Sequence, residues 1–359
     1  MRAESTKDFD PGAFVRPAIA RLKPYSSARD EFTGTANVFL DANENGLGSP
    51  TSRSYNRYPD PYQRELKSKI AALENVGADR LFIGNGSDEA IDLLFRVFCE
   101  PRVDNVIVCP PTYGMYEVSA AVNDIEVRRA PLTEAFGLDP YAVIAESDER
   151  TKLVFICSPN NPTGNSMDRE TILRIGDETG SIVVVDEAYI HFSSKESVAS
   201  EIELRPNIVV LRTFSKAWGL AGLRLGIAIA DPSIVSLLNK VKPPYNVSGA
   251  AQREAIEAIG EAPHVKAMIE KLLGLREELR EGLEALRIVE KVFPSDANFL
   301  LVRVPDPTAV YRALIGRGIV VRDRSRVELC EGCLRITVGT GEENSALVEA
   351  IEEIGKEML

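Results

Sequence analysis

Two residue types that commonly build catalytic and metal sites are scarce in this chain. Its 359 residues include two histidines and five cysteines. Histidine is a frequent catalytic base and the commonest metal ligand, so a site built on histidines is disfavoured. The odd cysteine count, with no signal peptide at the start, does not suggest a disulfide framework. Cys330 and Cys333 have the spacing of half a zinc site. No second pair follows, so we expect no metal and interpret Cys333 as leading into a strand.

The chain also lacks the patterns of a membrane protein or a nucleic-acid-binding protein. No apolar run approaches the ~18 residues of a membrane helix. The net charge is −12, and the sequence contains no run of lysine and arginine residues that could bind nucleic acid. We therefore expect a cytoplasmic protein that binds neither membranes nor nucleic acid.

The chain does contain short, continuous apolar runs separated by helix-like segments. Runs of this kind are typical of strands buried on both faces of a parallel sheet, and the connections are long enough for helical crossovers. The pattern predicts an α/β fold whose central sheet is mostly parallel and flanked by helices, with sites at the carboxyl ends of the strands. The predicted strands are 81–83, 105–109, 152–157, 182–185 and 208–211, and the clearest helices are 63–73 and 87–98.

The sequence pattern changes near residues 242–244, and the residues that follow predict a smaller α/β domain. We expect an N-terminal segment at 1–45 that packs with the small domain, a large domain at 46–245 and a small domain at 246–359. The small domain is predicted to contain a long helical stretch from 248 to about 286, a helix around 309–317, a final helix to residue 359, and strands near 298–302, 319–321 and 334–338.

The most informative stretch is 211–224, which directly follows a predicted strand. Lys216 stands next to Ser215, and Arg224 follows eight residues later beyond a glycine-rich turn. A lysine amine condenses with an aldehyde cofactor, and pyridoxal phosphate (PLP) is the usual one. A serine hydroxyl and an arginine fork beside that lysine could hold the phosphate of the cofactor. The alternative is a solvated lysine and a surface arginine at the start of an ordinary helix.

Two other strand ends carry residues that suit the same cofactor. After the strand at 182–185, Asp186 could pair with the protonated pyridine nitrogen, and Tyr189 could contact the phenolic oxygen of the ring. The rigid loop at 158–164 can present Asn161 as a hydrogen-bond donor. The alternative for Asp186 is a helix N-cap.

The first two strand ends offer an aromatic ring and an anion cradle. Tyr113, after the strand at 105–109, could lie on a flat ring. The segment 84–89 leads into a helix, and Ser87 or Asp88 could cap that helix while its free N–H groups face an anion. Glu89 stands where a dinucleotide fingerprint has its third glycine, which weakens a dinucleotide-binding oxidoreductase as an interpretation.

Together these segments make the chain similar to the PLP-dependent aminotransferases of fold type I. The Asn-Pro-Thr-Gly, Asp-Glu-Ala-Tyr and Ser-Lys-Ala segments match this broad class. The segments at 22–29, 57–61 and 332–339 resemble, more narrowly, the histidinol-phosphate aminotransferase family. The full set of matching segments covers nearly the whole chain: 22–29, 41–45, 57–61, 84–89, 110–116, 158–164, 185–192, 211–226 and 332–339.

The resemblance implies a role for each matching residue. Lys216 would hold PLP and move the proton between the substrate Cα and the cofactor C4′. Asp186 would pair with the ring nitrogen, and Tyr113 would stack on the ring. The other implied contacts are Asn161 and Tyr189 to the phenolic oxygen; Ser87, Asp88, Ser215 and Arg224 to the phosphate; and Tyr58 to the phosphate from a partner subunit.

The resemblance also implies the substrates and the assembly. An amino group would pass between histidinol phosphate and 2-oxoglutarate, giving glutamate, in histidine biosynthesis. Arg335 would bind the carboxylate of glutamate, and would share the phosphate of histidinol phosphate with Arg322 and Tyr25. Tyr245 would line the substrate pocket. The expected assembly is a homodimer with the site at the subunit interface.

Other functions remain open at this point. An aminotransferase for aromatic amino acids, or a PLP decarboxylase of a phosphorylated amino acid, could share all the cofactor residues. The former has less need of the second cation, Arg322. A non-catalytic regulator built on this fold would be expected to lose the lysine or the ring acid, and both are present.

Overall fold

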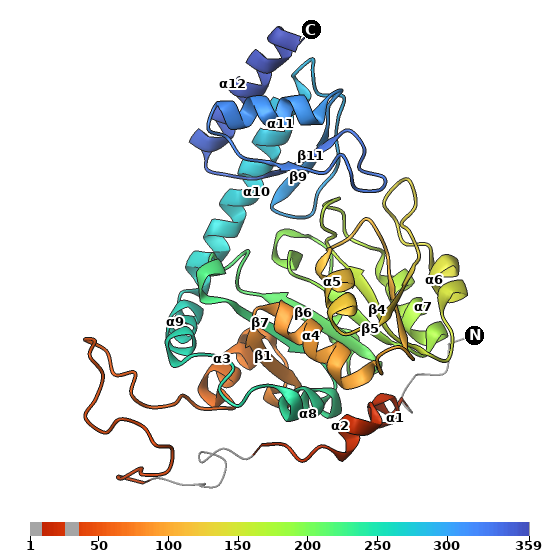
Figure 1. The fold of residues 1–359 in the computed structure, drawn as a ribbon. Helices are drawn as coiled ribbons and strands as arrows, with labels where there is room; N and C mark the ends of the chain where they lie inside the picture. Colours follow the sequence, from red (N-terminus) through yellow and green to blue (C-terminus); the bar gives the residue numbers. More distant parts are fainter. Residues whose placement is uncertain (1–8, 26–35, 359) are drawn as a thin grey trace.

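The computed structural model describes residues 9–25 and 36–358, and its largest element is a seven-stranded sheet (Figure 1). The strands lie in the order β1-β7-β6-β5-β4-β2-β3. Neighbours from β6 to β3 run parallel, whereas β7 runs antiparallel to both β6 and β1. The predicted, mostly parallel sheet is therefore confirmed. The strands are β1 (Leu81–Asn85), β2 (Asn105–Val108), β3 (Glu126–Arg129), β4 (Thr151–Cys157), β5 (Ile182–Asp186), β6 (Ile208–Thr213) and β7 (Leu225–Ile229).

Helices cover both faces of this sheet, which explains why its central strands are apolar throughout. On one face, Val184 and Val209 pack in a buried cluster with α4, α5 and α8. On the other face, Val183 and Val210 pack with α3, α6 and α7. Fully burying a side chain of this size contributes about 1.5–3 kcal/mol. The helices are α3 (Arg64–Glu74), α4 (Ser87–Phe98), α5 (Met115–Val122), α6 (Pro140–Glu146), α7 (Arg169–Thr179) and α8 (Pro232–Val241), and the 3₁₀ helices are η2 (Ala78–Arg80), η3 (Ile190–Phe192), η4 (Val198–Glu201) and η5 (Ala221–Leu223).

A smaller, antiparallel sheet forms the upper part of the molecule in Figure 1. Its strands lie in the order β10-β11-β9-β8, and a third buried cluster joins them to α10, α11 and α12. Among the described residues no helix is long and apolar enough to cross a membrane. The elements are α9 (Gly249–Gly260), α10 (Ala262–Glu284), β8 (Lys291–Val292), β9 (Phe299–Arg303), α11 (Pro307–Gly316), β10 (Arg322–Asp323), β11 (Cys333–Thr337) and α12 (Gly341–Met358).

The long helical stretch expected over 248–286 is confirmed, and it consists of two helices, α9 and α10, which meet at Glu261. Pro263 has no N–H to donate to the carbonyl four residues earlier, so a continuous helix would lose a hydrogen bond there. The strand expected at 319–321 is not formed. Val320 is exposed, and pairing with β11 begins only at Arg322.

Two strands of the large sheet, β3 and β7, were not predicted. The edge strand β3 reads Glu-Val-Arg-Arg and is mostly exposed, so only its pairing with β2 makes it a strand. The strand β7 contains Gly226, where a glycine is required. A Cβ at this position would lie 2.1 Å from the backbone nitrogen of Ser87.

The described N-terminal residues pack on the large domain. The backbone N–H of Arg16 in the turn between α1 (Pro11–Phe14) and α2 (Pro17–Arg21) donates to the carbonyl of Val97, and its guanidinium pairs with Glu100 at 3.2 Å. The packing with the small domain that we expected for this segment is therefore not seen for residues 9–25. Residues 26–35, which include part of the matching segment 22–29, lie outside the described residues.

Candidate active site

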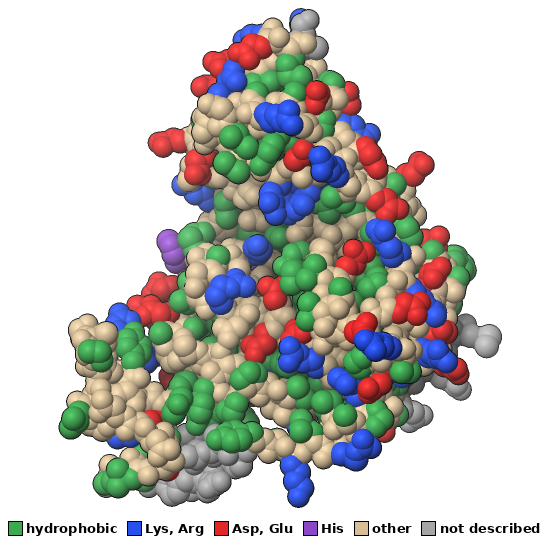
Figure 2. All heavy atoms as spheres, viewed as in Figure 1, with side chains coloured by type: hydrophobic (Ala, Val, Ile, Leu, Met, Phe, Trp, Pro, Cys, Tyr) green, Lys and Arg blue, Asp and Glu red, His purple; other side chains and the backbone are tan. Residues whose placement is uncertain are grey.

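A cavity of about 670 Å³ lies where the carboxyl ends of the parallel strands face the small domain. On the face shown in Figure 2, lysine and arginine side chains gather where the two domains meet. The cavity brings together eleven of the fourteen residues for which the sequence predicted a role. They are Ser87, Asp88, Tyr113, Asn161, Asp186, Tyr189, Ser215, Lys216, Arg224, Arg322 and Arg335.

Asp186 is the buried acid of this cavity, at the end of β5. Its carboxylate accepts hydrogen bonds from the Tyr116 hydroxyl at 2.8 Å and from the backbone N–H of Ala188 at 3.0 Å. Burial raises the pKa of Asp186 to about 6, against the lowering effect of these two donors. Asp186 forms no ion pair within the described part of the chain. A buried carboxylate without a cationic partner is costly, so this position is suited to a cationic group of a ligand.

Sequence analysis did not identify Tyr116 as the partner of Asp186. Its ring is fully buried and stacks on Phe155 of β4, with centroids 4.8 Å apart. This packing directs the hydroxyl to the carboxylate and limits where the carboxylate can turn. The available signal was the spacing of Tyr113 and Tyr116: Tyr113 lies just before α5, Tyr116 lies in its first turn, and their ring centroids are 5.6 Å apart.

Lys216 follows β6, and its amine lies on the cavity side of the sheet. The Nζ atom is 5.6 Å from the centroid of the Tyr189 ring. The side chain of Lys216 is exposed and lines the cavity. Burial lowers the pKa of Lys216, and the positive charge of Arg335 lowers it further. A lowered pKa increases the fraction of neutral amine, which is the nucleophilic form that attacks a carbonyl carbon.

The N-terminus of α4 forms an anion cradle, although its cap differs from the one expected. Neither Ser87 nor Asp88 caps the helix, because the N-cap is Gly86, which has a φ of 75° and no side chain. The first N–H groups of α4 therefore have no side-chain acceptor in the described structure. The guanidinium of Arg224 lies above the same turn, and a Cβ on Gly86 would be 2.8 Å from it. Free N–H groups and an adjacent guanidinium suit a phosphate.

The other groups of the cradle are arranged around Arg224. The guanidinium lies 3.4 Å from the Ser215 hydroxyl and 3.5 Å from the Asp88 carboxylate. Asp88 also accepts a hydrogen bond from the Tyr113 hydroxyl at 3.1 Å. Because a carboxylate repels a phosphate, Asp88 is suited to contribute its backbone N–H rather than its side chain.

Arg335 of β11 joins the small domain to the cavity. Its guanidinium donates to the side-chain oxygen of Asn161, which leaves the Asn161 amide nitrogen available as a donor. The buried Arg335 Nε has no acceptor among the described residues. In the antiparallel pair of β10 and β11, Arg322 is directly opposite Arg335, so both side chains reach the same wall of the cavity.

With this geometry in place, the chain can be compared with known proteins. A family model for aminotransferase class I and II matches residues 31–351. The chain belongs to this aminotransferase family. It is 50% identical over 344 residues to a histidinol-phosphate aminotransferase of Cytophaga hutchinsonii, which covers 96% of the chain and 99% of the relative. It is 52% identical over 340 residues to one of Parabacteroides distasonis, covering 95% and 97%. The resemblance inferred from the motifs is therefore confirmed.

A solved structure confirms the fold. The structure of histidinol-phosphate aminotransferase from Sinorhizobium meliloti in complex with pyridoxal-5′-phosphate matches with a TM-score of 0.76, covering 89% of this chain and 90% of that one. At 23% identity, this match shows that the two chains share the aminotransferase fold.

Three predicted site residues of this aminotransferase, Tyr25, Tyr58 and Tyr245, do not line this cavity. Tyr25 is 74% exposed, and Tyr58 stacks on Tyr245 with ring centroids 4.4 Å apart. Tyr58 lies on the segment before α3, which runs away from the body of the protein (Figure 1). Sequence reasoning placed Tyr58 in a partner's site, and this stays a prediction.

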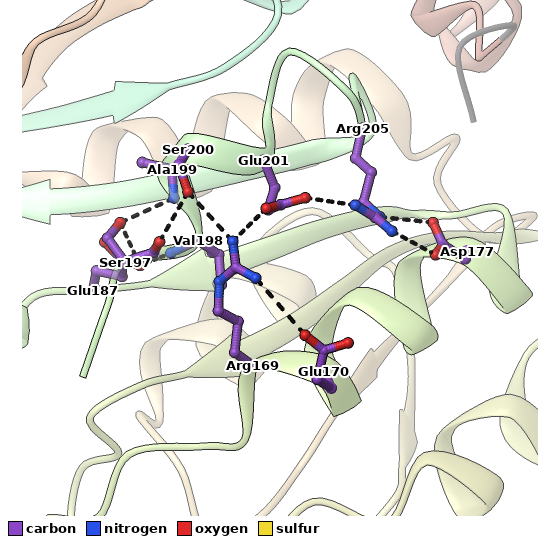
Figure 3. A network of polar contacts seen from close by, with 10 residues as sticks. All are labelled: Arg169, Glu170, Asp177, Glu187, Ser197, Val198, Ala199, Ser200, Glu201 and Arg205. Atoms are coloured by element: carbon purple, nitrogen blue, oxygen red, sulfur yellow. Dashed lines mark hydrogen bonds and ion pairs between the residues drawn. The ribbon is translucent and has the colours of Figure 1, made fainter. Parts of the chain in front are cut away.

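A network of ion pairs supports the strand end that carries Asp186 (Figure 3). The carboxylate of Glu187, the next residue, accepts hydrogen bonds from the Ser197 hydroxyl and from the backbone N–H of Val198 at 2.9 Å. Arg212 of β6 pairs with the same carboxylate at 3.0 Å. This pair ties the end of β5 to the end of β6, and so fixes the two segments from which Asp186 and Lys216 project. Further pairs extend the network from Arg169 to Glu170 and Glu201, and from Glu201 through Arg205 to Asp177.

The cavity wall contains three arginines that sequence reasoning missed: Arg129 of β3, Arg324 and Arg326. Arg324 and Arg326 follow β10 and line the cavity together with Arg322. The signal was the alternation Arg-Asp-Arg-Ser-Arg at 322–326, because every second residue of an extended chain faces the same side.

Proposed function

We propose that this chain transfers the amino group of L-histidinol phosphate to 2-oxoglutarate, giving imidazole-acetol phosphate and glutamate, as a step of histidine biosynthesis. The observation that carries the proposal is one cavity that combines Lys216, the unpaired acid Asp186 and the facing arginines 322 and 335. The high identity to the two relatives supports the same reaction. The proposed location is the cytoplasm.

The residues of the cavity fit PLP, the cofactor of this family. Asp186 lacks a cationic partner in the described structure, and a protonated pyridine nitrogen would supply one. The uncapped N-terminus of α4, Ser215 and Arg224 offer donors to a phosphate. A PLP ring held between Asp186 and these phosphate donors would contact Tyr113, Asn161 and Tyr189, all of which line the cavity. Bound PLP supplies an electron sink that makes the proton on the substrate Cα acidic.

The chain's own residues supply the rest of the chemistry. The amine of Lys216, whose pKa is lowered by burial and by Arg335, would hold the cofactor and carry the proton released at the substrate Cα. Asp186 would stabilise the protonated ring nitrogen, and Tyr116 keeps its carboxylate in place. Burial raises the pKa of Tyr189, so its phenol stays protonated and can donate to the phenolic oxygen of the ring.

One anion site must accept both substrates in turn. Histidinol phosphate carries a phosphate and no carboxylate, whereas glutamate carries two carboxylates and no phosphate. Forked guanidiniums suit this task because they bind either group through paired hydrogen bonds. We propose that Arg335 binds both substrates, and that Arg322, with Tyr25, binds mainly the phosphate.

The two arginines should therefore respond differently to substitution. We expect Arg335→Ala to lower kcat/KM for both half-reactions, and Arg322→Ala to lower it mainly for histidinol phosphate. A charge-assisted contact is worth about 1.5–3 kcal/mol, so each loss should be roughly tenfold or more. Stopped-flow measurement of both half-reactions for the two variants checks this. Equal, small effects of Arg322→Ala on both substrates would contradict the assignment.

Comparing three reactants with the unmodified protein tests the reaction itself. We expect rapid conversion of histidinol phosphate and slow conversion of phenylalanine, each followed by the visible absorbance of the cofactor. Rapid conversion of phenylalanine would indicate an aromatic aminotransferase. Release of carbon dioxide from a phosphorylated amino acid, such as O-phosphothreonine, would indicate a decarboxylase.

We also propose that the enzyme is a homodimer in which the segment before α3 contacts the partner. Leu40 and Leu47 on this segment are 92% and 99% exposed, although the segment has fixed internal contacts. Within it, Glu44 binds the backbone N–H of Tyr58 at 2.7 Å and the Arg57 guanidinium at 2.6 Å. Apolar side chains held this far out are suited to contact a second copy of the chain.

Mixed dimers test whether Tyr58 acts in the partner's site. We expect Tyr58→Ala to weaken PLP binding about tenfold, because one hydrogen bond to a charged phosphate is lost. A dimer of one Tyr58→Ala subunit and one Lys216→Ala subunit should regain one intact site, and so up to about half the activity of the unmodified dimer. If the mixed dimer is no more active than the Tyr58→Ala homodimer, Tyr58 acts within its own subunit or has no role.

A further inference from the structure

The strongest unexplained feature of the cavity is the guanidinium of Arg324. Its buried Nε atom has no hydrogen-bond partner within residues 9–25 and 36–358, and the side chain forms no ion pair there. Burial, and then the charge of Arg322, lowers the pKa of Arg324. A buried, charged donor without an acceptor is costly, and it persists where a ligand supplies the acceptor.

The carboxylates nearest to Arg324 along the chain are engaged elsewhere. Asp323 accepts hydrogen bonds from the backbone N–H of Ser325 at 2.8 Å and from its hydroxyl at 2.6 Å. Glu328 pairs with Arg129 at 3.1 Å. The positive charge of Arg324 therefore adds to that of Arg322 and Arg335 on the same wall of the cavity.

We infer that Arg324 is a third guanidinium of the substrate-anion site, and that it makes this site select a phosphate monoester over a carboxylate. The inference rests on the proposed function for the identity of the phosphorylated substrate. Two physical effects favour the phosphate. The attraction of each added cation is twice as large for a dianion as for a monoanion at the same distance. A phosphate monoester also has three terminal oxygens, so a third guanidinium finds an acceptor that a carboxylate does not offer.

The backbone supports this placement of Arg324. Its N–H donates to the carbonyl of Cys333 at 2.9 Å, which extends the pairing of β10 and β11 by one residue. Arg322 and Arg324 are two positions apart on this extended strand, so their side chains share the face toward the cavity. Arg335 is fixed on the adjacent strand by its register with Arg322. The three guanidiniums thus come from two neighbouring, hydrogen-bonded strands.

The test measures anion affinity in the PLP-loaded enzyme, in which the cofactor's own phosphate site is filled. Three variants are compared with the unmodified protein at constant ionic strength. Arg324→Met removes the charge but keeps much of the side-chain volume, and Arg324→Lys keeps the charge but loses the planar fork. Arg312→Ala removes an exposed positive charge from α11 of the same domain and serves as the matched control. Calorimetry gives the affinity for inorganic phosphate, and cofactor absorbance gives the affinities for histidinol phosphate and glutamate.

We expect Arg324→Met to lower the affinity for inorganic phosphate and for histidinol phosphate at least tenfold, and the affinity for glutamate less than about threefold. Arg324→Lys should regain part of the phosphate affinity, and Arg312→Ala should change none of the three. The inference would be overturned if Arg324→Met lowered the affinities for phosphate and glutamate equally, or if it left the affinity for phosphate unchanged.

The same measurements separate this inference from the proposed reaction. If Arg324→Met loses phosphate affinity while the unmodified enzyme fails to convert histidinol phosphate, Arg324 does bind the phosphate, and the proposed reaction is wrong. If the enzyme converts histidinol phosphate and Arg324→Met binds phosphate normally, the proposed reaction is supported, and the role inferred for Arg324 is wrong.

Discussion

Replacing Lys216 by alanine is expected to abolish both turnover and the covalent attachment of PLP. The unmodified protein should be yellow, and the variant should lose this absorbance. Lys216 is the lysine that lines the cavity, and its pKa is lowered by burial and by Arg335. Loss of its proton transfer alone should lower the rate by about 10²–10⁴, and loss of the attachment point should lower it further.

Chemical labelling shows whether Lys216 is the attachment site. Borohydride reduction of the loaded enzyme, followed by peptide mapping, should place the pyridoxyl label on Lys216 alone. Lys266→Ala, which removes an exposed amine from α10, should keep its colour, label and activity. A label on any lysine other than Lys216 would contradict the assignment.

Replacing Asp186 by asparagine is expected to leave PLP bound but to remove most of the activity. The amide is nearly the same size as the carboxylate, yet it cannot stabilise a positive charge on the ring nitrogen. Loss of one charge-assisted contact predicts a decrease in kcat of roughly tenfold or more. Steady-state kinetics and cofactor absorbance measure the two effects separately.

A matched aspartate tests the alternative that Asp186 only caps a backbone N–H. Asp306 is the N-cap of α11, where its side chain accepts from the N–H of Ala309 at 2.9 Å. Asparagine caps helices as well as aspartate does, so Asp306→Asn should retain full activity. Near-normal turnover of Asp186→Asn would mean that Asp186, too, acts only through such a bond.

The same substitution should change how the stability of the PLP-free protein depends on pH. Burial raises the pKa of Asp186 to about 6 in the folded protein, from an ordinary value of 3.8. The protonated form is therefore favoured by folding. Its contribution to the free energy of unfolding is complete below pH 3.8 and is lost as the pH rises through about 6. The shift corresponds to roughly 3 kcal/mol.

Asp186→Asn has no such titration, so the difference in stability between the two proteins isolates this group. Denaturant unfolding between pH 4 and 7 should show the unmodified protein losing stability relative to the variant as the pH rises. A constant difference across this range would mean that the carboxyl is not held in a desolvating environment.

Much of the large domain could be read from the sequence because its signals are local. The strands at 105–108, 151–157, 182–186 and 208–213 are apolar on both faces, and nothing but a covered sheet buries such runs. The helix at 87–98 has its apolar residues on one face and acidic residues in its first turn. The positions of Lys216, Asp186 and Asn161 followed from the strands that precede them.

Features that depend on pairing between distant segments were missed or misjudged. The strand β3 has no apolar run, and only its pairing with β2 makes it a strand. Gly86 replaces the expected side-chain cap of α4 because Arg224, far along the chain, approaches the same turn. Tyr116 reaches Asp186 across 70 residues, and its spacing from Tyr113 alone did not identify this partner.

The sequence by itself determined the family, the α/β class and the chemical types at the ends of the strands, since each depends on neighbouring residues and their spacing. The tertiary structure alone decided which groups are left without partners. Asp186 is buried with only neutral donors, and the buried Nε atoms of the half-buried Arg324 and Arg335 have no acceptor in the described structure. Burial and partnership depend on the whole surroundings of an atom, and those surroundings come from segments that the fold brings together.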